Sequence, residues 1–259
     1  MSRLRSFAPV IGIATFFGLW ELLVRVRHIG DYKLVKPSTA LRTVFNSRSV
    51  FLREARPSVW AALVGFSIAL SIAFVIGSLL AHSRVAERAV LPVALLIVVT
   101  PLFAYIQSVI TWFGFGFRSL VVMVAIVCFP PFLFATVAGL RAIDPAAHEL
   151  LRSVDASRWE VFRKLRVPSS LPYLFPAAKV SSGLALVGVT IGEPYAFIDH
   201  GLGLTIRRAA AAGIVAIPQL WGSIFVLGFI GSFAYLAISG VETVVRRWHN
   251  PSGANRNLS

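Results

Sequence analysis

The sequence predicts an all-α membrane protein that crosses the bilayer six times. Hydrophobic residues make up 57% of its 259 residues and charged residues only 14%, whereas a soluble domain typically carries about 25% charged residues. A soluble enzyme of this length would have too few polar side chains to cover its surface. The single cysteine, Cys128, cannot form an internal disulfide and fits no zinc-binding spacing.

Six apolar windows predict the spans, because about 20 apolar residues cross the hydrocarbon core as a helix. Arg3 and Arg5 precede the first window, as in a signal peptide, but no cleavage site of small residues follows it, so we expect a span there. Glu21 lies four residues before Arg25, which predicts an ion pair near the end of that helix. The windows are residues 6–24, 58–81, 89–113, 119–140, 174–197 and 219–241.

The spans divide the chain into a first span with an external amphipathic loop (1–56), a transmembrane domain (57–245) and a tail (246–259). An even number of spans places both termini on one side of the membrane, and we assign that side to the cytoplasm. The segments on this side hold 13 of the 25 Lys and Arg residues, but the first outer loop holds eight, so the positive-inside rule alone is ambiguous. The net charge of +14 is therefore assigned to membrane-flanking loops and not to nucleic-acid binding.

The basic first outer loop contains the pattern of an interfacial amphipathic helix over residues 38–54. Such a helix lies in the plane of the membrane, with its apolar face among the acyl chains and its cations at the headgroups. The side chains expected to face lipid are Leu41, Val44, Phe45, Phe51 and Leu52, and the arginines are Arg42, Arg48 and Arg53.

The loop after the fourth span carries the clearest local signals. Asp144 followed by Pro145 predicts a helix start, with Asp as the N-cap and Pro at the first helical position. Ser157 and Glu160 have the spacing of a capping box. They predict a second helix over residues 158–167, which ends before the next proline.

This loop, residues 141–173, also presents Trp159 and Phe162 on one helix face, because they are three residues apart. A charged loop with two such aromatic side chains is suited to docking into a groove on another protein. The alternative is that both side chains lie at the membrane interface, where Trp is common. The residues themselves do not distinguish the two interpretations.

The same loop resembles the EAA loop of ABC importer permeases. The family pattern is E-A-A, three residues, G, nine residues and I-x-L-P, and the spacing matches throughout, with Glu149 and Pro168 identical. Leu150 and Leu151 replace the two alanines, and Asp155 replaces the glycine. Since that glycine makes a turn and Asp is one of the few other residues that adopt left-handed backbone angles, we expect the bend to be kept.

Further segments resemble the nitrate, sulfonate, taurine and thiamine-precursor subgroup of these permeases. Pro101 begins a P-x-x-A segment, Trp112 begins W-F-G-x-G, and Glu193 precedes a G-L-G segment at Gly201. The resemblance covers residues 57–245 and implies the type I ABC importer permease fold. It assigns coupling to a partner ATPase to Glu149, Arg152, Asp155, Ser157, Trp159, Phe162 and Pro168.

The resemblance implies the permease subunit of an ATP-driven importer in the cell inner membrane. In this family two permease subunits form the pathway, two cytosolic ATPase subunits hold the coupling loops, and an extracytoplasmic binding protein delivers the solute. The chain has no G-x-x-x-x-G-K-[ST] phosphate-binding motif, so ATP and Mg²⁺ would be bound by the ATPase and no cofactor by this chain. We expect a homodimer, with a heterodimer as the alternative, surrounded by lipid and without nucleic acid.

Polar side chains within the spans are candidates for the pathway. An ionisable group at membrane depth is costly and usually functional, so Glu193 either lines the pathway or makes a structural or gating hydrogen bond. Lys179 is expected to snorkel toward the cytoplasm. The uncharged candidates, with packing inside the bundle as the alternative for each, are Gln107, Ser108, Thr111 and Thr190.

Small residues recur on one face of the second and fifth spans. In lipid, such residues let helices approach closely, so we predict tight helix packing, with sliding during gating as the functional alternative. The two stripes are Gly65, Ala69, Ala73 and Gly77, and Ser181, Ala185, Gly188 and Gly192.

We predict no catalytic site and no metal site. His148-Glu149 is not followed by the second His of a zinc protease, and no G-x-S-x-G segment is present. A secondary transporter driven by an ion gradient would favour paired intramembrane acids and repeated halves, and a non-transporting scaffold is a further alternative. We therefore predict a permease that moves a small solute by alternating access.

Overall fold

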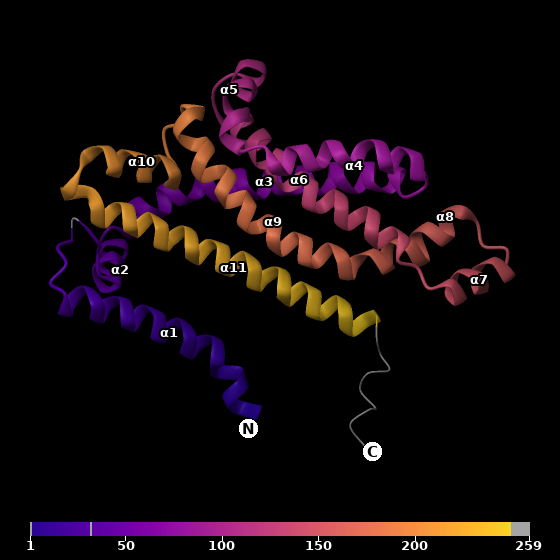
Figure 1. Ribbon diagram of the computed structural model, residues 1–259, viewed down its shortest axis with the longest axis horizontal. Helices are drawn as coiled ribbons and strands as arrows, with labels where there is room; N and C mark the ends of the chain where they lie inside the picture. Colours follow the sequence, from indigo (N-terminus) through magenta and orange to yellow (C-terminus); the bar gives the residue numbers. More distant parts are fainter. Residues whose placement is uncertain (1, 32, 250–259) are drawn as a thin grey trace. The chain divides into compact units, whose positions relative to one another are not determined.

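The computed structural model describes residues 2–31 and 33–249, and side chains over residues 10–31 and 33–245. Within these ranges every regular element is a helix (Figure 1), which confirms the predicted fold class. The chain forms two compact units, here called unit 1 (Met1–Ser58 with Asp199–Phe229) and unit 2 (Val59–Ile198 with Ile230–Ser259). The predicted tail, residues 246–259, lies outside the described side chains.

Among the described residues, four stretches are helical and apolar enough to span a membrane, and a bent pair adds a fifth if it counts as one span. Helix α1 (Ser2–Val26) covers the first predicted window, but its side chains are described only from Val10 onward. The four stretches contain α3 (Arg48–Leu80), α6 (Phe117–Arg141), α9 (Val167–Ala196) and α11 (Ile217–His249), and the pair is α4 (Arg84–Val99) with α5 (Leu102–Phe113).

The prediction of one helix over residues 89–113 is wrong. Helices α4 and α5 meet at a bend of 104°. Thr100 is extended, with φ −81° and ψ 123°, and Pro101 follows it. Proline has no N–H to donate and disfavours helical angles in the residue before it, so the helix stops there.

The predicted amphipathic helix over residues 38–54 is also wrong as a single element. It is divided at Ser47 into α2 (Pro37–Asn46) and the first turns of α3. Leu41, Phe45 and Leu52 are exposed as expected, but Phe51 is only 5% exposed. A Cβ atom added to Gly222 of α11 would lie 2.7 Å from the Phe51 ring, so Phe51 packs against protein and not lipid.

Two carboxylates link helices within unit 1. Glu21 pairs with Arg25 at 2.8 Å, as predicted, and also accepts hydrogen bonds from Ser38 N and Oγ at 3.0 and 2.7 Å. This carboxylate therefore joins α1 to the first turn of α2, whose N–H groups lack partners within the helix.

Glu54 performs a similar role for α10 (Leu202–Ala212). Its carboxylate accepts from Gly201 N at 2.9 Å and lies 3.0 Å from His200 Nδ1. One turn further along α3, Ser58 Oγ accepts from Leu202 N at 2.9 Å. Two side chains of α3 thus satisfy backbone donors at the start of α10.

Unit 2 is built around α6. Its side chains Leu120, Met123, Phe132, Leu133 and Leu140 are fully buried. Helices α3 and α9 approach α6 where small residues leave room. The predicted stripe residues Ala69, Ala73, Ser181 and Ala185 are buried there.

The glycines of the two stripes lie directly on α6. A Cβ added to Gly65 would be 2.6 Å from Val124, one added to Gly77 would be 2.7 Å from Thr136, and one added to Gly192 would be 2.9 Å from Leu120. At Gly188 the nearest atom would be the Val124 Cα at 3.2 Å. At Gly65 and Gly77 a Cβ would overlap the Cβ atoms of Val124 and Thr136 and force α6 away, whereas at Gly192 it would displace only the ends of the Leu120 and Met123 side chains.

Two ion pairs join helices within unit 2. Arg141 pairs with Glu87 and also donates to the carbonyls of Leu80 and Ala81, which ties the end of α6 to the α3–α4 turn. Lys179 does not snorkel as predicted: its Nζ lies 2.5 Å from Glu242 Oε2 of α11, and both side chains are largely buried. An acid within reach removes the need to extend toward water.

The different surroundings of Gly65 and Gly183 predict opposite effects for alanine at these two helix positions. Gly65→Ala should lower the free energy of unfolding by about 1–3 kcal/mol, because the added methyl group overlaps Val124. Gly183→Ala should raise it by about 0.5–1 kcal/mol, because a Cβ there meets nothing within 4 Å and alanine favours the helix. Thermal unfolding of the detergent-solubilised chain measures both, and equal shifts would contradict the packing argument.

Candidate functional site

Residues 144–168, here called the EAA-like segment, begin with a well-defined helix start. Helix α7 (Pro145–Ser153) has Asp144 as its N-cap, with the carboxylate accepting from Ala146 N at 3.0 Å. Pro145 occupies the first helical position, where no N–H is needed. The predicted start is confirmed.

The EAA-like segment then turns at Asp155, where the family pattern has glycine. Asp155 adopts φ +52°, in the left-handed region. Its N–H donates to Arg152 O at 3.1 Å, and Ala156 N donates to Leu151 O at 3.0 Å. This pair of bonds is the Schellman arrangement that closes a helix C-terminus, and the expected bend is present with aspartate in place of glycine.

The second helix of the segment also starts as predicted. Ser157 Oγ accepts from Glu160 N at 3.2 Å, and the Glu160 carboxylate accepts from Ser157 N at 3.0 Å, which completes a capping box. Lys164 lies 2.9 Å from Glu160, four residues earlier on the same face.

The predicted end of this helix before Pro168 is wrong. Helix α8 (Arg158–Val161) continues through a π-helical turn (Phe162–Arg166) directly into α9. A proline ring clashes with the backbone of the preceding turn. The wider π turn lies just before Pro168, and the helical path passes through it without a break.

The EAA-like segment presents apolar side chains to the outside. Leu150 and Val154 are both 67% exposed and Trp159 is 66% exposed. Glu149 and Arg152 are exposed beside them. Phe162 is half-buried, because it stacks on Trp159 at 5.6 Å and lies 6.5 Å from the His82 ring. The predicted anchors thus differ: Trp159 is mostly exposed, whereas Phe162 is half-buried between Trp159 and His82 of the α3–α4 turn.

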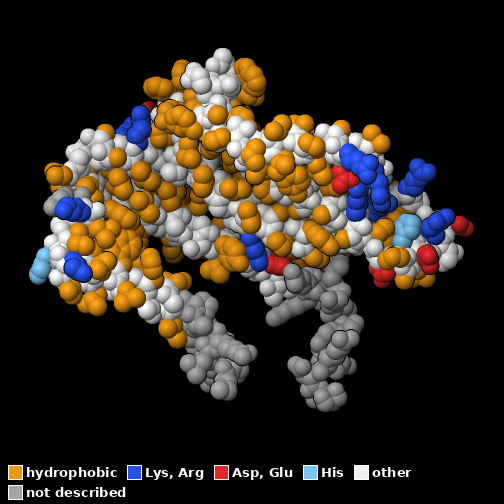
Figure 2. All heavy atoms as spheres, viewed as in Figure 1, with side chains coloured by type: hydrophobic (Ala, Val, Ile, Leu, Met, Phe, Trp, Pro, Cys, Tyr) orange, Lys and Arg blue, Asp and Glu red, His pale blue; other side chains and the backbone are white. Residues whose placement is uncertain are grey.

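The segment lies at one end of unit 2 (Figure 1). Figure 2 shows that charged side chains gather at this end, beside the hydrophobic surface over α4. An exposed apolar surface rimmed by charges marks an interaction site.

The pathway candidates lie in two different environments. Gln107, Ser108 and Thr111 are all exposed on one face of α5, while the opposite face packs Ile106 and Ile110 near Met123. Thr190 is half-buried and donates to Leu186 O of its own helix at 2.7 Å.

Glu193 is fully buried in α9. The next turn of that helix is held by Gly116 N, which donates to Ala196 O at 2.6 Å. The carboxylate of Glu193 is therefore enclosed by protein, unlike the open face of α5.

The structure also reveals partnered charges that sequence reasoning missed. Glu54 and Glu242 were not singled out, although both are acids within long apolar helices. Glu54 and Ser58 are four residues apart, a spacing that places two acceptors on one helix face. Their partners are distant in the sequence, so no local pattern indicates them.

Known transport permeases are similar to this chain in sequence and in fold. The formylaminopyrimidine transport permease protein ThiX of Halalkalibacterium halodurans is 25% identical over 246 residues, which cover 94% of this chain and 96% of that protein. The riboflavin transport system permease protein RibX of Chloroflexus aurantiacus is 33% identical over 188 residues, which cover 73% and 69%. An inward-facing structure of the MetNI methionine ABC transporter has the same fold, with a TM-score of 0.65 and 18% identity over 76% of this chain and 97% of that one.

The family described as "Binding-protein-dependent transport system inner membrane component" matches residues 49–252. This match includes the bent α4–α5 pair, the glycine contacts on α6 and the entire EAA-like segment. The chain belongs to this family and is a permease subunit of an ABC importer.

Proposed function

We propose that this permease couples to its ATPase through the EAA-like segment. The observation that carries the proposal is the exposed Trp159 on a segment braced at both helix starts and at the bend. Exposed aromatic side chains on a preorganised surface are typical of interface hot spots. Exposed Glu149 and Arg152 would supply complementary charge at the rim.

The family works with an ATPase and a substrate-binding protein, and we infer the finer organisation as follows. Two copies of this chain form the pathway and two ATPase subunits bind the EAA-like segments, with ATP and Mg²⁺ held by the ATPase. The segment then faces the cytoplasm, together with both termini. ATP-driven movement alternates access for a small solute.

The cargo class is proposed from the relatives. ThiX and RibX are named for a formylaminopyrimidine and for riboflavin, and both are nitrogen heterocycles. A small heterocyclic solute is therefore the first class to test, using the cognate binding protein as the delivery subunit.

The coupling proposal predicts that Trp159→Ala weakens ATPase binding by about 10- to 30-fold, because hot-spot truncations cost about 2 kcal/mol and 1.4 kcal/mol is a factor of ten. Glu149→Ala should reduce substrate-stimulated ATP hydrolysis in the same complex. Binding of purified ATPase to the permease in nanodiscs gives the first value, and phosphate release gives the second.

The matched control is Trp60→Ala, since Trp60 is 60% exposed on α3 and lies outside the segment. Trp60→Ala should leave ATPase binding unchanged. If Trp159→Ala and Trp60→Ala behave alike, Trp159 is a membrane-interface anchor and the coupling role is wrong.

The bend predicts that Asp155→Gly stabilises the EAA-like segment by about 1 kcal/mol, because glycine adopts φ +52° without steric cost. Asp155→Val should loosen it, since a β-branched residue is strained there. Hydrogen exchange of residues 145–156 measures the change. Ala147→Gly, inside α7, is the control and should accelerate exchange by removing a good helix former.

We propose a structural hydrogen bond for Glu193, in keeping with its complete burial. Glu193→Gln should then retain transport and thermal stability, because an amide still accepts a hydrogen bond. Glu193→Leu should lower stability by about 1–3 kcal/mol by leaving its partner unsatisfied. Loss of transport in Glu193→Gln without loss of stability would instead assign the charge to the pathway.

A further inference from the structure

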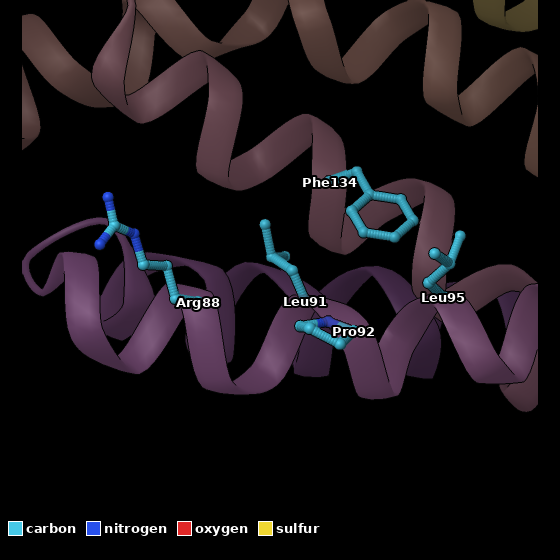
Figure 3. Close-up of a pocket in the computed structure, with 5 residues that line it drawn as sticks. All are labelled: Arg88, Leu91, Pro92, Leu95 and Phe134. Carbon is cyan, nitrogen blue, oxygen red and sulfur yellow. The ribbon is translucent and has the colours of Figure 1, made fainter.

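An open groove of about 410 Å³ runs along α4 beside α6 (Figure 3). Leu91, Pro92 and Leu95 of α4 and Phe134 of α6 form its apolar wall, and Arg88 lies at one end. Arg88 and Leu95 are seven residues apart on one helix, which is about 10 Å at 1.5 Å per residue. The groove therefore has a long apolar part and a single cationic end.

The cationic end lies on the same side of unit 2 as the EAA-like segment. The α3–α4 turn leads into it, and His82 of that turn lies 6.5 Å from Phe162. Glu87, next to Arg88 in the sequence, is already paired with Arg141. No ion pair involves Arg84 or Arg88 among residues 10–31 and 33–245, so their charges remain available.

The remainder of α4 has the character of a lipid-facing surface. Leu95, Leu96, Val98 and Val99 are all more than half exposed. In a membrane protein such side chains contact acyl chains, and the polar end of the same helix is at headgroup depth. The apolar part of the groove therefore suits an acyl chain.

We propose that this groove binds an anionic phospholipid, with the phosphate at Arg88 and an acyl chain along Leu91, Leu95 and Phe134. Guanidinium groups bind phosphate oxygens in a bidentate manner, and a neighbouring Arg84 adds to the attraction. Anionic headgroups are attracted to basic residues at the membrane surface. The groove offers one cation beside an otherwise apolar wall, which matches one phosphate headgroup with its acyl chain, and a second copy of this chain is the alternative that the oligomeric state tests.

This inference depends only on the membrane location of the family and not on the coupling proposal. Failure of the Trp159→Ala test would leave it intact, and its own failure would leave coupling intact.

The test is native mass spectrometry of the full-length chain in detergent, titrated with phosphatidylglycerol or with phosphatidylcholine of the same acyl chains. Phosphatidylglycerol should bind more tightly. Arg88→Gln should weaken its binding about tenfold, as expected for loss of a charge-assisted hydrogen bond. Arg88→Lys should restore part of the affinity, since it keeps the charge but not the bidentate geometry.

Two further variants distinguish lipid binding in the groove from nonspecific attraction of anionic lipid to basic residues. Arg118→Gln removes an exposed arginine from the first turn of α6 and should leave binding unchanged. Leu95→Trp keeps Arg88 but fills the apolar part, and should weaken phosphatidylglycerol binding.

Three results would overturn the proposal. Equal effects of Arg88→Gln and Arg118→Gln would mean that only total charge matters. Unchanged phosphatidylglycerol binding in Leu95→Trp would mean that the headgroup binds at Arg88 without an acyl chain in the groove. Conversion of dimers to monomers by Leu95→Trp, with lipid binding unchanged, would assign the groove to contact between copies.

Discussion

The close approach of α3 and α9 to α6 is the constraint on which unit 2 depends. At Gly65 and Gly77 of α3 an added Cβ atom would overlap the Cβ atoms of Val124 and Thr136, and at Gly188 of α9 it would lie 3.2 Å from the Val124 Cα. In lipid, replacing a lipid contact by a contact with another apolar helix contributes little free energy. Helix association therefore relies on close packing. These contacts position the helix that carries the EAA-like segment at one end and buried Glu193 near the other.

Because α8 continues into α9, the EAA-like segment is connected by one helical path to the residues that pack on α6. The capping box starts a helical path at Ser157 that passes through the π turn and reaches Ala196. Gly188 and Gly192 place the far part of that path on α6. On the coupling proposal, a displacement at Trp159 would be transmitted along this continuous helical path, which is the kind of connection that alternating access requires.

Local signals in the sequence were sufficient wherever the cause is local. Asp144, Ser157 and Asp155 act on backbone groups within a few residues, so the helix starts and the bend of the EAA-like segment were predictable. The end of the second helix could not be predicted in this way. Proline normally stops a helix, but here a π turn carries the helical path past Pro168. Pro101 is a local signal for the bend between α4 and α5. The uninterrupted apolar composition on both sides of it nevertheless favours a single span.

The amino-acid sequence alone indicates that this protein lies in a membrane, that it is helical, and that it resembles an importer permease. Composition and short-range spacing carry that information. The preference of apolar side chains for lipid and the capping of backbone groups both act within one helix. Helix packing, in contrast, sets the partners of Glu54, Lys179 and Glu242, the burial of Phe51 and the groove at Arg88. Each of these depends on contacts between helices far apart in the chain, and those contacts exist only once the helices have packed.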